Sequence, residues 1–273
     1  MPVAEAQDML ARRASSEHYE VLAVHYGTLR GRKRELFHRY EAYGEPDTEV
    51  EMAYYFWILR SRSQTILVDT GFDPAVGTRR GRTVVQAPLD ALREAGVEPR
   101  SVSTVVVTHL HYDHIGNLAA FPEATLVVPR RELEFWTSPV ARRAQFAAHV
   151  EAAEVAAIDA AHRGGRVRLT DGVEEIADGI VAICVGGHSP GQQVTVVPAA
   201  GGDVVLASDA VHFYEEFELD RPFGVIANLA EMYEAYDLLR TLAAAPGAVL
   251  VPGHDPAVLE RFTALDGHAV RLG

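Results

Sequence analysis

Residues 108–114 read THLHYDH and come directly after the apolar run at 105–107. The imidazoles of His109, His111 and His114 and the carboxylate of Asp113 fall within this short stretch. The apolar run favours a buried strand, and a loop leaving a strand end can turn alternate side chains toward one point. Histidine and carboxylate are ligands that zinc accepts. The segment therefore predicts a metal centre.

Three further metal-type residues follow apolar runs in the second half of the chain: His188, Asp209 and His254. Glycine or another small residue precedes each of them, which lets the backbone approach closely. The full set is then five histidines and two aspartates. It exceeds the ligands of one tetrahedral zinc and suits two adjacent metal ions that share a carboxylate. The sequence predicts a binuclear site.

The pattern of apolar residues predicts an α/β fold. Strands are expected at 21–24, 54–59, 65–68, 102–107, 166–169, 173–176, 180–185, 194–197, 204–207 and 249–251. Helical spacing marks 88–95 and 229–244, and one or two helices are expected across 130–162. Strands followed by helices in both halves indicate two packed sheets with helices on their outer faces. We predict a single domain over 1–273 with a helical insertion around 130–162.

Composition excludes several classes of partner. The chain has 25 Lys and Arg against 38 Asp and Glu, a formal charge of −13, which disfavours nucleic acid and anionic membranes. A single cysteine, Cys184, rules out a disulfide within the chain. No apolar run approaches membrane-spanning length. A cytoplasmic protein without membrane or nucleic-acid partners is expected, and a homodimer is left open.

These residues resemble the ligand pattern of the metallo-β-lactamase superfamily. The likeness runs from about Asp69 to His254, and Asp69-Thr70-Gly71 after the run 66–68 resembles that family's early strand-end motif. The resemblance implies a four-layer αββα sandwich with metal ions at the sheet edge. It assigns seven ligands, with His109, His111 and His188 on one metal, Asp113, His114 and His254 on the other, and Asp209 bridging.

The resemblance also implies roles in a hydrolysis. A metal-bridging hydroxide would be the nucleophile, Asp113 would carry a proton to the leaving oxygen, and Asp69 would accept the N–H of a ligand imidazole. Two divalent ions are expected, with zinc first, although the same ligands suit iron, manganese and cobalt.

Two loops favour the lactonase branch of that superfamily. Residues 188–192 (HSPGQ) and 251–256 (VPGHDP) look most like the group that includes N-acyl-homoserine lactonases and pyridoxolactone hydrolases. His111 stands where diiron flavoprotein oxidoreductases carry glutamate, and true zinc β-lactamases lack a ligand like His114. We therefore predict a metal-dependent carboxylic ester hydrolase of the quorum-quenching kind, which opens an N-acyl-homoserine lactone or another small lactone.

Other functions stay open at this point. A thioester hydrolase of the glyoxalase II type is the alternative enzyme. A non-catalytic metal-binding or sensory domain and redox chemistry at a single iron are the further alternatives.

The sequence departs from many lactonases after the bridging aspartate. Those enzymes carry a tyrosine three residues later, and this chain has His212 there. His212 could donate a hydrogen bond to the developing oxyanion or the ring oxygen, or fill space only. Tyr214 could serve instead if the loop turns differently.

The remaining candidates concern the substrate pocket. Arg79, Arg80 and Arg82 form a basic loop that could meet an acidic substrate or simply face solvent. Aromatic residues could cover the metals or belong to the core: Phe135, Trp136, Phe146, Phe213, Tyr214, Phe217 and Phe223. Isolated histidines are assigned no role: His18, His25, His38, His149, His162 and His268.

Overall fold

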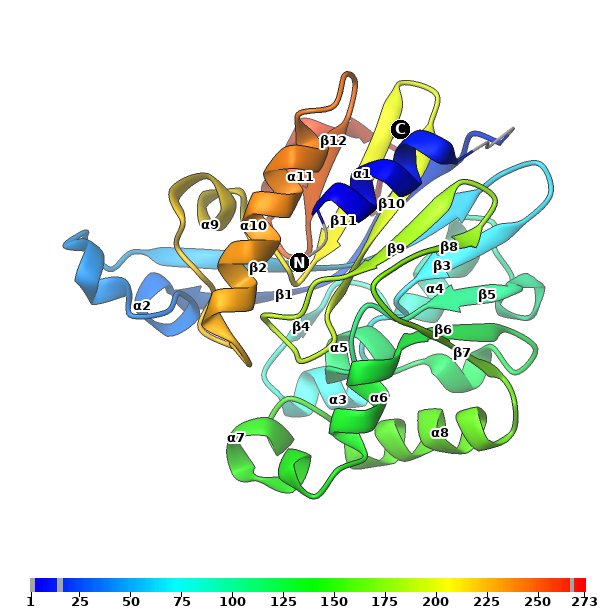
Figure 1. The fold of residues 1–273 in the computed structure, drawn as a ribbon. Coiled ribbons are helices and arrows are strands. Elements are labelled where there is room, and N and C mark those ends of the chain that lie inside the picture. The colour runs from blue at the N-terminus through cyan, green and yellow to red at the C-terminus, as the bar shows by residue number, and fades with distance from the viewer. Residues whose placement is uncertain (1–2, 14–16, 266–267) are drawn as a thin grey trace.

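Two β-sheets pack face to face at the centre of the protein, which a computed structural model describes for residues 3–13, 17–265 and 268–273 (Figure 1). The first sheet has nine strands in the order β13-β14-β1-β2-β3-β5-β6-β7, with β4 beside β1. These strands are β1 (Glu20–Arg32), β2 (Glu49–Arg60), β3 (Thr65–Val68), β4 (Thr83–Val84), β5 (Thr104–Val106), β6 (Thr125–Pro129), β7 (Val167–Thr170), β13 (Thr263–Ala264) and β14 (Ala269–Arg271).

The second sheet has five strands in the order β12-β11-β10-β9-β8. They are β8 (Val173–Ala177), β9 (Ile180–Cys184), β10 (Gln193–Ala199), β11 (Gly202–Ser208) and β12 (Val249–Pro252). The strands β3, β5, β6 and β7 pair in parallel along the first sheet, and β11 pairs in parallel with β12 in the second. Parallel strands end at one edge, which is where the predicted ligands follow them.

Helices cover the outer faces of both sheets. The α-helices of the described residues are α1 (Val3–Arg12), α2 (Lys33–Leu36), α3 (Pro74–Arg79), α4 (Pro88–Glu94), α5 (Tyr112–Ile115), α6 (Arg130–Trp136), α7 (Ala144–Ala147), α8 (Ala152–Arg163), α9 (Tyr214–Leu219), α10 (Leu229–Ala243) and α11 (Ala257–Arg261). Short 3₁₀ turns lie at Tyr40–Tyr43, Pro99–Ser101, Leu118–Ala120 and Val140–Arg142.

Alternating side chains of the strands divide the core into layers. One cluster lies between the sheets and includes Trp57 of β2, Val106 of β5 and Leu206 of β11. A second joins the opposite face of the first sheet to α4 and α8, and a third joins the second sheet to α1 and α10. Because successive residues of a strand face opposite sides, each sheet buries both faces. The predicted four-layer αββα arrangement of the metallo-β-lactamase fold is confirmed.

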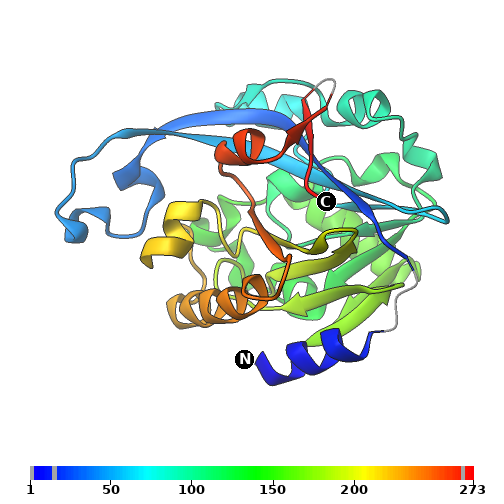
Figure 2. The same cartoon turned by 90° about the horizontal axis from the view of Figure 1, so that it is seen from above.

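The largest departure from the sequence-based strands is a long hairpin formed by β1 and β2. A register shift between His25 and Gly27 interrupts the pairing, after which both strands continue outward and carry α2 at the tip (Figures 1 and 2). The outer part of the hairpin contacts little of the core, so many of its residues are polar. The sequence therefore lacks the apolar pattern that would have predicted strands there. We call the part of the hairpin beyond this shift, residues 27–54, the hairpin arm. Its residues Leu36 and Phe37 pack on Phe213 and Phe223, near the candidate site.

The segment 130–163 holds three helices, α6, α7 and α8, where one or two were expected. Pro139 follows α6, and the extended backbone at Arg143 and Glu151 separates the later helices. Proline cannot donate a backbone hydrogen bond inside a helix, so the apolar spacing across this segment does not continue as one rod. Because alanine favours helix throughout this segment, the composition did not show where the helices end.

Glu154 of α8 should make stability depend on pH. Burial raises the pKa of its carboxyl to about 7, and the nearby carboxylates of Glu151 and Asp73 add to the rise. Since the unfolded chain ionises this group at a lower pH, the folded state loses stability as the pH rises through about 4.5 to 7. We expect Glu154→Gln to raise Tm more at about pH 8 than at about pH 5. Thermal unfolding followed by circular dichroism measures both shifts, and equal shifts would contradict this assignment.

The described residues contain no helix that is both long and apolar enough to cross a bilayer. The amino-terminal helix α1 packs on β8, β9 and α10, with Ala6 fully buried. Helix α1 therefore covers the second sheet. The homodimer stays a prediction.

Candidate metal centre

All seven predicted ligands meet at the edge where the strands end. His109 and His111 follow β5, and Asp113 and His114 lie in the short helix α5. The other three stand in loops after strands of the second sheet: His188 after β9, Asp209 after β11 and His254 after β12. Every one of these side chains is buried. Contacts between residues far apart in the chain thus assemble the set that the sequence pattern selected.

Asp209 lies between two groups of imidazoles. Its Oδ2 atom is 3.8 Å from Nε2 of His109 and 3.3 Å from Nε2 of His188. Its Oδ1 atom is 3.2 Å from Nε2 of His114 and 3.1 Å from Nε2 of His254. Oδ2 is thus the oxygen beside the first group and Oδ1 the one nearer the second, with Nε2 of His254 also 3.3 Å from Oδ2. A carboxylate placed between two groups in this way is suited to bridge them.

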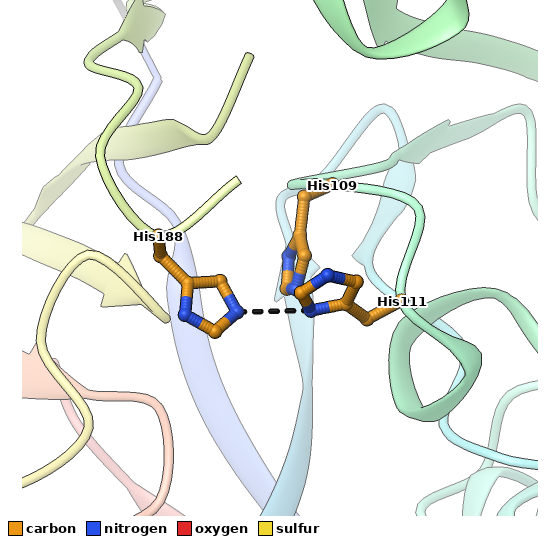
Figure 3. A group of neighbouring side chains, drawn as sticks. All are labelled: His109, His111 and His188. Atoms are coloured by element: carbon orange, nitrogen blue, oxygen red, sulfur yellow. Dashed lines mark hydrogen bonds between the residues drawn. The ribbon is translucent and has the colours of Figure 1, made fainter. Parts of the chain in front are cut away.

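The first group consists of His109, His111 and His188, whose ligand atoms lie within 4.8 Å of one another (Figure 3). Nδ1 of His111 is 2.9 Å from Nε2 of His188. Burial lowers the pKa of all three imidazoles well below the ordinary value, and neighbouring histidines act in the same direction. Neutral imidazoles are the form that binds a metal ion.

The second group consists of Asp113, His114 and His254. Oδ2 of Asp113 is 3.7 Å from Nε2 of His114 and 3.9 Å from Nε2 of His254. A hydrogen bond of 2.6 Å from the hydroxyl of Tyr26 to the carbonyl of Asp113 fixes the backbone of this ligand. The two groups reproduce the two ligand sets expected from the sequence.

Two buried ring nitrogens test whether these residues fit metal ions. Nε2 of His109 and Nε2 of His114 have no hydrogen-bond partner among the described residues. A buried polar atom without a partner is costly, and such atoms in natural proteins call for an explanation. Both nitrogens face the interior of the cluster beside Asp209, so bound cations would satisfy them. The donor set of imidazole nitrogens and carboxylate oxygens fits divalent metals.

The Nδ1 atoms of two other predicted ligands, His188 and His254, contact backbone carbonyl groups. Nδ1 of His188 lies 2.9 Å from the carbonyl of Val225, and Nδ1 of His254 lies 2.8 Å from the carbonyl of Ala53. Such contacts fix the tautomer and leave Nε2 free to bind metal. The main chain therefore orients these imidazoles before any ion binds.

Asp69 makes the contact that the sequence suggested. Its Oδ2 atom is 2.7 Å from Nδ1 of His114, and its two oxygens accept 2.8 Å hydrogen bonds from the backbone N–H and the hydroxyl of Thr108. Asp69 has a φ of 61°, and Ser208, directly before Asp209, has a φ of 46°. Left-handed backbone at non-glycine residues is strained and is found mainly at functional sites. β3 and β11 thus end in strained turns that direct the side chains of Asp69 and Asp209 toward the centre.

Glu132 is a residue that sequence reasoning missed. This fully buried carboxylate of α6 accepts hydrogen bonds from the N–H of Leu110 at 3.0 Å, the N–H of Gly191 at 2.6 Å and Nε1 of Trp136 at 2.7 Å. The hydroxyl of Ser189 also donates to it. Glu132 therefore ties the loop of His109 and His111 to the loop of His188. A glutamate in an amphipathic helix gives no local signal of this role.

His212 lies beside the metal ligands, as expected for the position that holds tyrosine in many lactonases. Its Nε2 atom is 3.1 Å from Oδ2 of Asp209 and has no hydrogen-bond partner among the described residues. Its Nδ1 atom is 3.2 Å from Oε2 of the buried Glu216. Burial opposes protonation, but Glu216 and Asp209 raise the pKa of His212 to about 9. The ring stacks on Phe223 with centroids 3.8 Å apart, so its orientation is fixed.

Tyr214 is not brought to the centre, so the suggestion that it could replace the missing tyrosine is corrected. Its hydroxyl donates to the carbonyl of Leu250 at 3.3 Å, and Arg261 lies over its ring. The backbone N–H of Tyr214 donates to Asp255, and α9 starts at this residue. The start of this helix turns the side chain away from the metal ligands.

Two adjoining cavities open beside the ligands. The smaller, of about 170 Å³, is lined by Asp113, Asp209, His212 and His254 together with Tyr54, Arg82, Tyr112 and Phe223. The larger, of about 350 Å³, is lined by Trp136, Phe146, Pro190 and Ile226. Both share Glu35, His111, His149, His188 and Val225. The smaller one, the metal-side cavity, thus adjoins a larger one whose lining includes several apolar side chains.

The candidate pocket residues divide between these cavities and the core. Of the aromatic residues, Trp136, Phe146 and Phe223 line the cavities. Phe135 packs against Trp136 and Phe146, Phe213 belongs to the cluster under the hairpin arm, and Phe217 packs toward α10.

One histidine that received no role from the sequence belongs to the site. His149 lines both cavities, and its ring centroid is 5.3 Å from that of His111. It lies between α7 and α8, far from the THLHYDH loop in sequence. Only the fold of the segment 130–163 places it there.

Comparison with known proteins agrees with this geometry. The sequence profile described as the Metallo-beta-lactamase superfamily matches residues 51–254. The chain is 28% identical over 195 residues to the N-acyl homoserine lactonase AttM of Azorhizobium caulinodans, covering 65% of this chain and 67% of the relative. It is 26% identical over 194 residues to the N-acyl homoserine lactonase AiiA of Bacillus thuringiensis subsp. kurstaki, covering 66% of this chain and 72% of the relative.

A solved structure of a quorum-quenching N-acyl homoserine lactone lactonase shares the fold. It superposes with a TM-score of 0.73 at 19% identity, over 94% of this chain and 100% of the other. Since the family profile spans most of the sequence, the chain belongs to the metallo-β-lactamase superfamily.

Proposed function

We propose that the protein is a binuclear metal-dependent lactonase, a carboxylic ester hydrolase that opens the ring of an N-acyl-homoserine lactone or another small lactone. The observation that carries this proposal is Asp209, with one oxygen toward each of two complete ligand groups. The relatives that are N-acyl homoserine lactonases support the same substrate class. Quorum quenching would be the biological role of such an activity.

The chain's own residues would hold two divalent metal ions, with zinc as the expected metal. His109, His111 and His188 would bind one, Asp113, His114 and His254 the other, and Asp209 both. When bound, such ions supply a hydroxide nucleophile near neutral pH and polarise the carbonyl oxygen of the substrate. Asp69 would keep His114 in the tautomer that presents Nε2 to the metal.

The reaction adds water across the acyl carbon–oxygen bond of the lactone and yields a carboxylate, a hydroxyl group and a proton. Asp113 lines the metal-side cavity and is the group that would carry the proton to the leaving ring oxygen. His212 would donate from Nε2 to an oxygen of the substrate, with Glu216 holding the opposite nitrogen. The apolar walls of the larger cavity, formed by Trp136, Phe146 and Ile226, would accept an acyl chain.

Removal of metal is the direct test. We expect prolonged chelation to lower kcat/KM for a neutral lactone by at least about a hundredfold, because the site loses its nucleophile and its carbonyl activation. Proton release in weakly buffered solution measures ring opening, and added Zn²⁺ should restore it. A sample dialysed without chelator is the control. Unchanged ring opening by fully metal-stripped protein would contradict the proposal.

The same assay separates the alternatives. A glutathione thioester hydrolysed faster than every lactone would make the protein a glyoxalase II-type enzyme. Full metal occupancy without turnover of lactones, thioesters or simple esters would instead support a binding or sensory role.

A further inference from the structure

Arg82 brings a positive charge into the metal-side cavity. It lies in the loop between α3 and β4 and lines the same cavity as Asp113, Asp209 and His254. Its neighbours on this basic loop behave differently, because Arg79 and Arg80 both form ion pairs of 2.8 Å with Glu151. The loop is thus anchored by two arginines, and the third is directed to the site.

The guanidinium of Arg82 is held without an acidic partner. Its Nε atom donates to the hydroxyl of Tyr112 at 2.8 Å, and Nη1 donates to the carbonyl of Arg80 at 3.0 Å. Among the residues that the structure describes, no carboxylate oxygen lies within ion-pairing distance, 4.0 Å, of this side chain. Arginine stays protonated in proteins, and a partly buried cation without a direct ion-pair partner is unfavourable. The carboxylate of Asp113 attracts this guanidinium only from beyond ion-pairing distance. The structure therefore leaves room for an anion from outside the chain.

The other charges of this cavity do not supply that anion. Asp113 and Asp209 belong to the metal ligands, so bound cations would balance them. Glu35 lines the cavity from α2 of the hairpin arm, and its Oε2 atom accepts the backbone N–H of Arg32 at 2.9 Å. Within the described part of the chain, Arg82 is the one Lys or Arg side chain that lines this cavity.

We propose that Arg82 binds a carboxylate carried by the substrate, so that the preferred substrate is a small lactone with an acidic substituent. This inference rests on the proposed lactonase function and names the substrate class. A guanidinium can form paired, charge-assisted hydrogen bonds with a carboxylate. The formal charge of the chain is −13, so its overall field repels anions and a local cation is needed to hold one.

A matched pair of substrates tests this assignment. γ-Butyrolactone bearing a carboxylate at the γ carbon and the corresponding carboxamide have nearly the same shape and differ by one charge. Charge-assisted hydrogen bonds contribute about 1.5–3 kcal/mol, which corresponds to about ten- to a hundredfold in affinity. We expect the wild-type enzyme to prefer the carboxylate by at least about tenfold in kcat/KM, mainly through KM.

Variants of the basic loop separate binding from loop structure. In Arg82→Gln the carboxylate-to-carboxamide ratio of kcat/KM should fall to about one, and Arg82→Lys should retain part of it. Arg79→Gln is the matched control, since it removes the same charge at the end of α3, close in sequence but outside the cavity, and it should keep the wild-type ratio. A wild-type ratio near one, or an equal loss for both substrates in Arg82→Gln, would overturn the proposal.

A binding measurement keeps this test independent of the proposed function. The ring-opened product of the acidic lactone is 2-hydroxyglutarate, whose binding to metal-loaded protein can be followed by calorimetry. We expect Arg82→Gln to weaken it by at least about tenfold, with Arg79→Gln as the control. If no lactone is hydrolysed but this difference is found, the lactonase proposal fails and the anion site stands. Equal binding by wild type and Arg82→Gln would overturn the anion site alone.

Discussion

Asp209→Ala is expected to lower kcat/KM for lactone hydrolysis by at least about a thousandfold and to reduce metal binding. Asp209 has one oxygen facing His109 and His188 and the other facing His114 and His254. Without the carboxylate, two bound cations would face each other with less negative charge between them. Metal content by mass spectrometry and proton release by the same samples measure the two effects.

Two further variants make this result interpretable. Asp209→Asn keeps the size of the side chain and should show the same loss, while circular dichroism reports whether the fold is retained. Asp237→Ala is the control, because it removes an exposed aspartate of α10 that pairs only locally with Arg240. An Asp209→Ala protein with two metal ions and a wild-type rate would exclude Asp209 as the bridging ligand.

Glu132→Ala is expected to destabilise the protein by about 3–5 kcal/mol, the largest stability effect that we predict. Its carboxylate accepts hydrogen bonds from two backbone N–H groups, at Leu110 and Gly191, and from the side chains of Trp136 and Ser189. Removing it leaves these buried donors without an acceptor, and each unsatisfied donor costs free energy. Urea unfolding of the metal-free protein measures the change in the free energy of unfolding.

The same substitution should also disturb the centre, because Glu132 joins the two loops that carry His109, His111 and His188. We expect weaker metal binding even at temperatures where the variant remains folded. Glu134→Ala is a matched control on the same helix, since Glu134 is exposed, and it should change stability by less than about 0.5 kcal/mol. A loss below about 1 kcal/mol in Glu132→Ala would contradict this role of Glu132.

The sequence selected the seven residues of the proposed ligand set because they follow strands with clear apolar patterns. His188, Asp209 and His254 each come just after such a run, and parallel neighbouring strands end at the same edge. Position along a strand is a local property, so it can be read from a single sequence. The αββα fold and the meeting of the ligands followed from it.

The residues around the ligands could not be found in this way. Glu132 and Glu216 lie in helices whose spacing shows only that one face is buried, and His149 lies in a loop without a motif. The sequence marked Arg82 only as one of three arginines in a basic loop, with no sign of which one faces the site. Their roles depend on contacts with segments far away in the chain, such as that of Glu132 with Gly191 or of Arg82 with the cavity of Asp209. The hairpin arm was missed for a related reason, since its outer strand residues are largely polar and its apolar Leu36 and Phe37 pack on Phe213 and Phe223 and not on a sheet.

The fold class and the residues that meet at the strand ends could therefore be predicted from the sequence, because strand periodicity and position after a strand are local properties. Only the tertiary structure decided how those ligands are oriented and which side chains line the cavities. It placed Tyr214 away from the centre, His212 against Asp209 and Arg82 in the metal-side cavity. The physical reason is that hydrogen bonding and burial between distant segments fix side-chain direction, and no local pattern of residues specifies those contacts.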